Sequence, residues 1–516
     1  MDLVQKTRNF LKENNIDYLL VNSTNEFLVE YPALDENSRY ILTNFSGSTG
    51  DAIISQNKIL LFVDGRYHEQ ADLEVDKSQV TVVKMKIGES FSDLLVEKLS
   101  PDSTFAVVSK KNSQARVEAL KKALKKKNIK MKLIDFDPVL EMQKCKDAKR
   151  QRGAVKIDIS ITGLSSDEKI KKVTKTLKKD EAILITNLEE ISYLLNLRDF
   201  SSNYSSSVKR PPELVKKSSN ANIVYVDKTS ITAYDYALLG KKAKPLKVNP
   251  VKEMKSVKTN AEIEHYKKCF KRTDKALMAT REFIEHNNNI SEADIAKNLE
   301  ENFYKFGAKS LSFKSIVAKD KNSALAHYSK NSPDEILKDG SLVLFDCGAY
   351  YEGGYATDIT RVFVKGTPSK LQKKVYTIVL KSFLKAFNKK ITSGITGFAL
   401  DKTARKFLNE NKPAGFEFSH SLGHGIGINV HESPPRLAFS RLAKTPIKPN
   451  MCFTIEPGLY SPKHFGVRLE NSCYLAKQNE KFIIKSFSDM CFEEKLIDYD
   501  LLTVTEKKQL KSFKVL

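Results

Sequence analysis

The first part of the chain alternates short apolar runs with helical patterns. An amphipathic first helix is predicted by apolar positions that recur at helical spacing between charged residues, namely Leu3, Val4, Phe10 and Leu11, together with Thr7. Strands are predicted at residues 52–54, 58–63, 80–86 and 104–109. Helices are predicted between them at residues 91–99 and 113–127. This alternation predicts a mixed α/β domain over residues 1–135.

A second, shorter α/β pattern follows. Helices are predicted at residues 170–177 and 188–195, and strands at residues 182–186 and 222–226. A Ser-rich stretch at residues 201–219, which contains Pro211 and Pro212, is typical of a loop. We therefore predict a second α/β domain over residues 136–250, with a less distinct boundary than the first.

The third region begins with signals for two long helices. Thr259 is followed three residues later by Glu262, which is the pattern of a capping box, and apolar positions continue at helical spacing to Ile284. A second helix is predicted from about Ser291, with Gly307 just past its end. Strands are then predicted at residues 341–346, 356–364, 451–455 and 466–475, and helices at residues 368–389 and 397–410. We assign residues 251–516 to a third domain.

Composition raises a question about charge. The chain of 516 residues has 86 Lys and Arg against 63 Asp and Glu, which gives a formal net charge of +23. Such an excess can indicate a nucleic-acid partner. The lysines recur along the whole sequence, however, and the densest run, at residues 121–127, lies in a helix-like stretch. We interpret the excess as a solvated surface and expect no nucleic-acid partner.

The sequence pattern also bears on membranes and on the compartment. There is no run of eighteen apolar residues, so we expect no membrane-spanning helix and no membrane partner. Charges interrupt the first helix, unlike the apolar core of a signal peptide. The six cysteines are scattered without a C-x-x-C pair, as in reduced intracellular proteins. We therefore expect a cytoplasmic protein.

Side chains that can bind metal ions gather in the third region. Each acid among them ends or interrupts an apolar run, where a carboxylate is costly to bury unless it is paired or bound to a metal. One such acid alone more often faces water at a strand end, but five residues together favour a site for two divalent cations. A hairpin would bring the first two together at one side of a sheet. The five are Asp346, Asp358, His424, Glu456 and Glu470.

Histidines are concentrated in the same region. The chain has only eight, and His420, His424 and His431 fall within twelve residues. His327 stands in the segment Ala326-His327-Tyr328. A lone histidine is more often structural, but clustering beside the candidate ligands favours proton handling or polarisation of a carbonyl.

These segments are similar to those of a known family. The third region resembles the pita-bread metallopeptidases that include aminopeptidase P, prolidase and methionine aminopeptidase. Their ligand order of Asp, Asp, His, Glu and Glu is met by the five residues above. The resemblance is carried by residues 326–328, 420–425, 429–432, 454–458 and 466–470.

The first two regions narrow the resemblance to the long, three-domain form of the Xaa-Pro aminopeptidases. Residues 45–51 and 64–67 resemble the N-terminal domain of that form, and residues 187–198 resemble its middle domain. The resemblance implies an α/β (α+β) fold, with two creatinase-like N-terminal α/β domains followed by a pita-bread catalytic domain.

Three features depart from the family pattern. Asp346 and Asp358 are 12 residues apart where the family usually has 11, an insertion that a bulge or a wider loop can absorb. His424 and His431 are 7 residues apart, as in shorter relatives. The Ser-rich stretch after Arg198 stands where the family usually has a segment containing Asn-Pro, which bears on substrate-side or interdomain contacts.

The resemblance also implies a mechanism. A water that bridges two cations loses a proton and attacks the peptide carbonyl. Asp358 and Glu470 bridge the ions, Asp346 completes the shell of one ion, and His424 and Glu456 complete that of the other. Glu456 is the candidate to accept the proton of the water. We expect Mn²⁺, with Zn²⁺ or Co²⁺ as alternatives.

The remaining residues are expected to act on the substrate. By the same resemblance, His327 and His431 polarise the carbonyl and stabilise the oxyanion. His420 shapes the pocket for proline. Arg468, two residues before Glu470, supports the ligands without binding metal, and we place it with His420 among the substrate-binding residues.

The implied activity is release of the first residue from peptides with proline in second position. Proline has no N–H and a restricted φ, so general peptidase sites fit it poorly. One alternative is a prolidase that acts on Xaa-Pro dipeptides only. Another is a non-catalytic binding protein on the pita-bread fold, which would be expected to have lost ligands. We also expect a homodimer.

Overall fold

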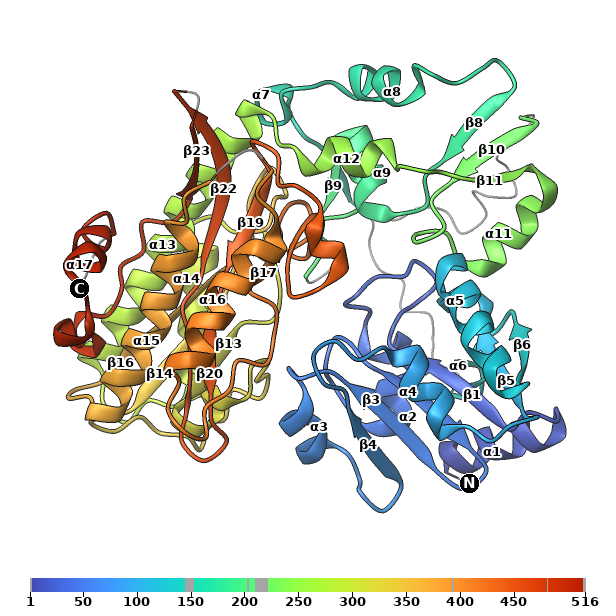
Figure 1. The fold of residues 1–516 in the computed structure, drawn as a ribbon, viewed down its shortest axis with the longest axis horizontal. Coiled ribbons are helices and arrows are strands. Elements are labelled where there is room, and N and C mark those ends of the chain that lie inside the picture. The colour runs from blue at the N-terminus through green and yellow to red at the C-terminus, as the bar shows by residue number, and fades with distance from the viewer. Residues whose placement is uncertain are drawn as a thin grey trace. The chain divides into compact units, whose positions relative to one another are not determined.

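The computed structural model describes residues 2–143, 153–201, 204–208, 221–391, 394–479 and 481–513. The chain divides into two compact units (Figure 1). Unit 1 comprises Met1–Gln151, Ile170–Ile191 and Lys209–Asn249, and unit 2 comprises Arg152–Lys169, Ser192–Val208 and Pro250–Leu516. The division into three domains, with boundaries at residues 135 and 250, stays a prediction.

Unit 1 contains a mixed sheet of six strands in the order β4-β3-β2-β1-β5-β6 (Figure 1). Its strands are β1 (Tyr18–Asn22), β2 (Asp51–Ser55), β3 (Ile59–Val63), β4 (Val80–Lys84), β5 (Thr104–Val108) and β6 (Lys130–Ile134). Its helices are α1 (Leu3–Glu13), α2 (Ser38–Thr43), α3 (His68–Glu74), α4 (Phe91–Lys98), α5 (Gln114–Leu124) and α6 (Pro138–Gln143). The expected helices and strands of this region are present, and β1, β6, α2 and α3 are additional to them.

A second sheet in unit 1 has three parallel strands in the order β11-β10-β8. They are β8 (Glu181–Leu184), β10 (Ile223–Val226) and β11 (Ala243–Pro245), with α11 (Ala233–Leu239) connecting the last two. The helices expected at residues 170–177 and 188–195 are α8 (Ser166–Thr174) and α9 (Leu188–Leu195). Most of the loop expected at residues 201–219, namely residues 202–203 and 209–219, lies outside the described residues.

The first half of unit 2 consists of two packed helices followed by an antiparallel sheet. The predicted capping box of Thr259 and Glu262 starts α13 (Asn260–His286), and a second one starts α14 (Glu292–Lys305). Gly307 follows α14 with φ +90°, the left-handed backbone that ends a helix. The sheet has the order β13-β14-β16, with β13 (Ile316–Lys319), β14 (Leu342–Cys347) and β16 (Ile359–Val364).

The second half of unit 2 repeats this plan with a larger sheet. Its helices α15 (Lys370–Phe387) and α16 (Gly397–Asn411) pack against each other. The sheet has the order β18-β17-β19-β22-β23, with β17 (Gly423–Gly425), β18 (Glu432–Leu437), β19 (Cys452–Ile455), β22 (Asn471–Gln478) and β23 (Lys481–Ser486). The run expected at residues 466–475 is divided between β21 (Gly466–Arg468), which pairs with β20 (Gly458–Tyr460), and β22.

Short elements complete unit 2. They are β7 (Ala154–Lys156) paired with β9 (Leu197–Asp199), β12 (Ser310–Leu311) paired with β15 (Ala349–Tyr350), α7 (Ile159–Thr162), α12 (Pro250–Ser256) and α17 (Val504–Leu510). No helix among the described residues is long and apolar enough to cross a membrane. The five cysteines in the described ranges are buried and unbridged, and Cys145 lies outside those ranges.

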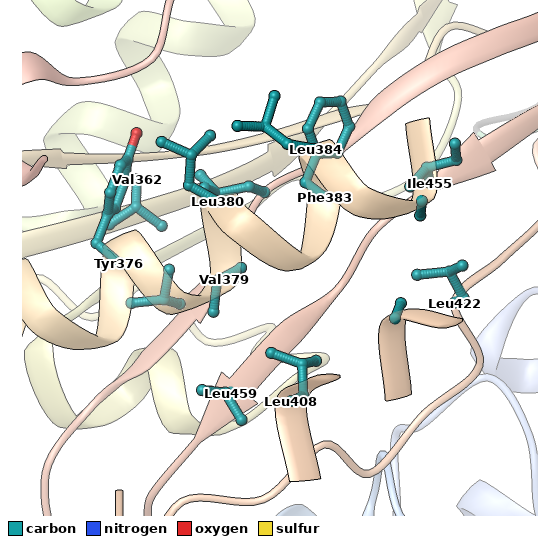
Figure 2. Close-up of a cluster of buried hydrophobic side chains, with 14 of the residues drawn as sticks. Val362, Tyr376, Val379, Leu380, Phe383, Leu384, Leu408, Leu422, Ile455 and Leu459 are labelled. Carbon is teal, nitrogen blue, oxygen red and sulfur yellow. The ribbon is translucent and has the colours of Figure 1, made fainter. Parts of the chain in front are cut away.

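The largest core of unit 2 lies around α15 (Figure 2). Val379, Leu380 and Phe383 project from this helix and are fully buried. They belong to one apolar cluster with Leu408 of α16 and Ile455 at the end of β19. Since Glu456 directly follows Ile455, this core anchors the strand end that presents one of the candidate ligands.

We predict that Leu380→Ala lowers the free energy of unfolding by about 2–5 kcal/mol, because it removes a fully buried side chain and leaves a cavity. Leu442→Ala is the matched control, because Leu442 is 73% exposed and its loss should change stability by less than about 0.5 kcal/mol. Chemical denaturation of both variants measures the difference. Equal effects would contradict the assignment of this core.

Candidate metal centre

The five candidate ligands stand at the ends of strands from both sheets of unit 2. Asp346 lies on β14, and Asp358 directly precedes β16. His424 is the middle residue of β17, Glu456 directly follows β19, and Glu470 lies between β21 and β22. The two halves of unit 2 therefore both contribute to one site.

The expected hairpin between the two aspartates is present. β14 and β16 pair antiparallel with a continuous register, in which Asp346 lies opposite Thr360. In the connecting loop, Tyr350 and Ala356 form an isolated bridge. The strand ladder itself needs no bulge.

Four of the five candidate ligands lie within reach of one another. Ligand atoms of Asp358, His424 and Glu470 all lie within 4.8 Å of each other. His424 Nε2 is 3.4 Å from Asp358 Oδ2 and 3.8 Å from Glu456 Oε1. Such a group of one imidazole and three carboxylates suits a divalent cation of the first transition row.

Arg468 joins Asp346 to this group. Its guanidinium donates from Nη2 to Asp346 Oδ2 (2.5 Å) and from Nε to Thr360 Oγ1 (3.1 Å). The Thr360 hydroxyl in turn donates to Glu470 Oε2 (2.7 Å). Arg468 therefore contacts Asp346 directly and Glu470 through the hydroxyl of Thr360.

Burial dominates the electrostatics of the cluster. It raises the pKa of Glu456 to about 7, although the charge of His424 opposes the shift. Burial and the neighbouring carboxylates also raise the pKa of Asp346 and of Glu470. Burial alone would lower the pKa of His424, but the hydrogen bond with Asp358 and the charge of Glu456 raise it to about 9. Without cations, the site therefore tends to retain protons.

Two carboxylate oxygens in the cluster fit bound cations. Asp346 Oδ1 and Glu470 Oε1 are buried, and neither has a hydrogen-bond partner among the described residues. An orphaned buried carboxylate oxygen is costly unless a cation or a proton compensates for it. The four carboxylates and one imidazole also form an oxygen-rich set that suits two divalent ions. The residues present therefore fit two metal ions.

Gly423 allows the strand that carries His424 to approach its neighbour closely. A Cβ atom at Gly423 would lie 2.1 Å from the backbone oxygen of Thr454 on β19. The Thr454 hydroxyl also accepts a hydrogen bond from His424 N (3.2 Å). Only glycine fits at this position, and the close approach fixes His424 beside β19.

Arg361 binds the two sheets together beneath the ligands. Its side chain is fully buried on β16, and its Nη1 donates to the backbone oxygen of Glu470 (2.6 Å). Its Nη2 and Nε donate to Asn471 Oδ1, Met490 O and Cys491 O (2.7–2.9 Å). The strand of Asp358 is thereby tied to the segment of Glu470.

His420 belongs to a hydrogen-bonded chain that ends at the ligands. Its Nε2 is 2.7 Å from the hydroxyl of Tyr460, which accepts a hydrogen bond from Arg468 Nη1 (2.8 Å). Its Nδ1 is 2.7 Å from Ser421 O. Nδ1 also lies 3.9 Å from Glu456 Oε2, so both ring nitrogens have partners near the candidate ligands. His420 is therefore placed as a fixed wall of the site.

His431 lies directly beside His424. The two rings have centroids 4.4 Å apart and stand at 85° to each other. The next residue, Glu432, is buried and forms ion pairs with Lys255 Nζ (2.7 Å) and Lys258 Nζ (3.3 Å). These charges outweigh burial and lower the pKa of Glu432. The segment that carries His431 is therefore anchored by a carboxylate that stays charged.

His327 is placed by the segment on which it lies. Ala326 and Tyr328 on either side are buried, whereas His327 itself is partly exposed. Upstream, Ser323 Oγ donates to Gly466 O (3.0 Å) and accepts from Gly466 N (2.8 Å). This pair ties the segment to β21, the strand that carries Arg468.

Several residues of the site were not predicted from the sequence. Thr360 and Tyr460 each contact a candidate site residue, and Arg361 holds the sheets together. Arg361 had a recognisable signal, because it is a charged residue inside the apolar run 359–364. Thr360 and Tyr460 had no recognisable signal in the sequence, because their partners are remote in sequence or lie on another strand.

Two protein-family models match parts of the chain. The model of metallopeptidase family M24 matches residues 264–477. The model of the creatinase/prolidase N-terminal domain matches residues 4–144. The two matches confirm a mixed α/β fold with a creatinase-like N-terminal domain and a pita-bread domain, and the second of the two expected creatinase-like domains stays a prediction.

Curated relatives extend the match over nearly the whole chain. A protein of Laccaria bicolor named "Probable Xaa-Pro aminopeptidase P" is 27% identical over 98% of this chain and 88% of its own length. A protein of Dictyostelium discoideum named "Xaa-Pro aminopeptidase 1" is 26% identical over 98% of this chain and 90% of its own length.

A solved structure has the same fold. The X-prolyl aminopeptidase of Caenorhabditis elegans, described as a cytosolic enzyme with a di-nuclear active site, matches with a TM-score of 0.89. The match covers 99% of this chain and 94% of that protein, at 22% identity. This likeness shows the fold.

We predict that the metal-free protein loses stability as pH rises from 5 to 9. Glu456 (pKa about 7) and His424 (pKa about 9) both have folded-state pKa values above their ordinary ones. Each group therefore stabilises the fold below its ordinary pKa, and this contribution is lost as pH rises through the raised value. The contribution is about 1.4 kcal/mol for each unit of pKa difference, as an upper limit.

Added Mn²⁺ should restore stability, with an effect that grows with pH because it competes with protons for the same groups. Thermal unfolding with and without Mn²⁺ at several pH values measures both trends. Glu456→Gln is the control that should remove the part of the slope between pH 5 and 7. A midpoint that responds neither to pH nor to Mn²⁺ would contradict the assignment.

Proposed function

Because the model of metallopeptidase family M24 matches residues 264–477, we propose that the chain is a metal-dependent aminopeptidase that releases the first residue from peptides with proline in second position. The observation that carries the proposal is the gathering of Asp358, His424 and Glu470, whose ligand atoms lie within 4.8 Å of one another. Beside them, Asp346 and Glu470 each have a buried carboxylate oxygen without a hydrogen-bond partner among the described residues. The names of the curated relatives and of the C. elegans structure support the same specificity.

The five candidate ligands divide into two roles. Asp358 and Glu470 would hold both ions, Asp346 would complete the shell of one, and His424 and Glu456 that of the other. When bound, two divalent ions polarise the scissile carbonyl and lower the pKa of the attacking water. We propose Mn²⁺ as the resident ion, with Zn²⁺ and Co²⁺ as alternatives that metal analysis of the purified protein distinguishes.

Glu456 is proposed as the group that accepts the proton of the attacking water. A carboxylate is a suitable general base, and Oε2 of Glu456 lies 3.9 Å from His420 Nδ1. Its neighbour His424 is 3.8 Å away and offers the opposite charge. A carboxylate so placed can pass the proton on to the leaving imino nitrogen of proline.

His327 and His431 are proposed to donate to the carbonyl oxygen as negative charge develops on it. The contact of His431 with His424 places one of the two donors next to a ligand. His420 and Arg468, joined through Tyr460, are proposed to form the wall that receives the proline ring. A rigid wall suits proline, whose ring has few conformations to lose on binding.

Two further properties are proposed on the same basis. The scattered, unbridged cysteines and the description of the C. elegans protein as cytosolic support a cytoplasmic location. A homodimer is proposed as well, and analytical ultracentrifugation tests it. The domain boundaries at residues 135 and 250 are proposed for the three-domain form and can be tested by limited proteolysis.

We predict that Asp358→Asn reduces Mn²⁺-dependent hydrolysis of an Xaa-Pro tripeptide by more than roughly 100-fold, which exceeds the usual cost of losing a supporting residue. The reason is that the amide cannot supply the negative charge that holds a cation. The exposed Asp334→Asn is the matched control and should keep full activity. A folded Asp358→Asn protein with full activity would exclude this site for the metal.

Substrate length separates the proposal from its nearest alternative. We predict that a tripeptide Xaa-Pro-Xaa is cleaved with a higher kcat/KM than the dipeptide Xaa-Pro, measured by release of the first amino acid. A strict preference for the dipeptide would indicate a prolidase. No hydrolysis of either peptide by a protein that binds Mn²⁺ would favour a non-catalytic binding protein on the same fold.

A further inference from the structure

The segment that carries His327 is held by a glutamate on a neighbouring helix. This segment, residues 319–332, runs from the end of β13 through a short 3₁₀ turn to the residues after Tyr328. Glu292, the first residue of α14, is fully buried against it. The residue lies outside all the motifs by which the site was recognised.

The carboxylate of Glu292 accepts four hydrogen bonds, and all of them come from this segment. Its Oε1 accepts from the backbone N of Lys319 (2.6 Å) and from Asn322 Nδ2 (3.0 Å). Its Oε2 accepts from the hydroxyl of Tyr328 (2.7 Å) and from the backbone N of Ser332 (2.9 Å). A carboxylate can accept about four hydrogen bonds, so the accepting capacity of Glu292 is filled by this segment.

The start of α14 adds backbone contacts to the same segment. The backbone N of Ala293 lies 3.3 Å from the carbonyl oxygen of Ser332. Helix capping itself is performed by Ser291 and Asp294, which form the capping box. The side chain of Glu292 is therefore free of the capping role, and the positive end of the helix dipole favours its charge at this place.

The rest of the segment is fastened to the two strands that carry candidate site residues. Asp320 Oδ1 accepts from the backbone N of Leu342 at the start of β14 (2.8 Å), and Ser323 pairs with Gly466 on β21. Glu292 holds Tyr328, the residue directly after His327, and both ends of the segment. Charge-assisted hydrogen bonds are the stronger and more directional ones, so they limit the positions that His327 can take.

We propose that Glu292 is a positioning residue for peptide hydrolysis, which acts by fixing the 319–332 segment so that His327 meets the substrate carbonyl. The proposal rests on the function proposed above for His327. Among the described residues, the side-chain hydrogen bonds of Glu292 all join it to this segment and none joins it to a candidate ligand. It affects the reaction by fixing the position of the His327 imidazole. A displacement of about 1 Å at such a group can cost roughly 100-fold in rate.

Glu292→Gln tests the proposal. The substitution replaces one carboxylate oxygen by an amide NH₂ group, which cannot accept the hydrogen bonds that this oxygen accepted. We expect kcat for an Xaa-Pro tripeptide to fall by roughly 10- to 100-fold, with little change in KM, since His327 acts on the developing oxyanion. Glu301→Gln makes the same change at an exposed position of α14 and should leave kcat unchanged.

A double-mutant cycle with His327→Ala separates positioning from general damage. If Glu292 acts through His327, Glu292→Gln should have no further effect on kcat in the His327→Ala background. An equal loss in both backgrounds would overturn the proposal. The thermal midpoint of each variant is measured alongside, so that a protein that fails to fold is recognised.

Amide hydrogen exchange provides a readout that does not depend on activity. Glu292→Gln should speed exchange in the peptide that covers residues 319–332, because the amides of Lys319 and Ser332 lose their acceptor. Unchanged exchange would overturn the proposal. A wild-type protein that cleaves no Xaa-Pro peptide, but whose exchange depends on Glu292, would instead overturn the proposed function and leave the contact intact.

Discussion

The concentration of buried carboxylates at the junction of two sheets is the constraint on which the site depends. Desolvation of each ion costs several kcal/mol, and this cost is recovered only where an opposite charge or good hydrogen bonds meet it. The protein supplies one guanidinium, Arg468, and one imidazole, His424, against four carboxylates. The raised pKa values of Glu456 and Glu470 reflect this excess of buried carboxylates over positive groups. Positive charge from outside the chain would offset the remaining negative charge, and divalent cations would supply it.

Residues that surround the carboxylate cluster hold it in place. Arg361 is fully buried and donates to backbone and side-chain oxygens of the segments around Glu470 and Cys491. Its contacts need no cation, so the two sheets stay joined whether or not metal is bound. Below β19, the apolar core around α15 fixes the strand end that presents Glu456. The ligands are thus preorganised by neighbours that are satisfied without them.

Local signals in the sequence predicted local structure. They could not predict contacts between residues that are remote in sequence. The capping box at Thr259 and the glycine after α14 were recognised because all their partners lie within a few residues. The ligand set was recognised because its motifs resemble a family. β17, by contrast, has only three residues, Gly423–Gly425, and exists because β19 and β18 lie on either side of it. Likewise, the hydrogen bond from Thr360 to Glu470 joins residues 110 positions apart and has no signature in either segment.

Four acids in and beside the candidate site, namely Glu292, Glu432, Glu470 and Asp346, fall into two groups that differ in the hydrogen bonds and ion pairs they form. Glu292 accepts four hydrogen bonds, and Glu432 is paired with two lysines, so the protein itself satisfies both carboxylates. Glu470 has one donor and one orphaned oxygen, and Asp346 is likewise left with an unpartnered oxygen among the described residues. The satisfied acids lie behind the segments of His327 and His431, where rigidity is useful. The unsatisfied ones lie where the two sheets meet, because a carboxylate whose needs the protein already met would have little left to offer a cation.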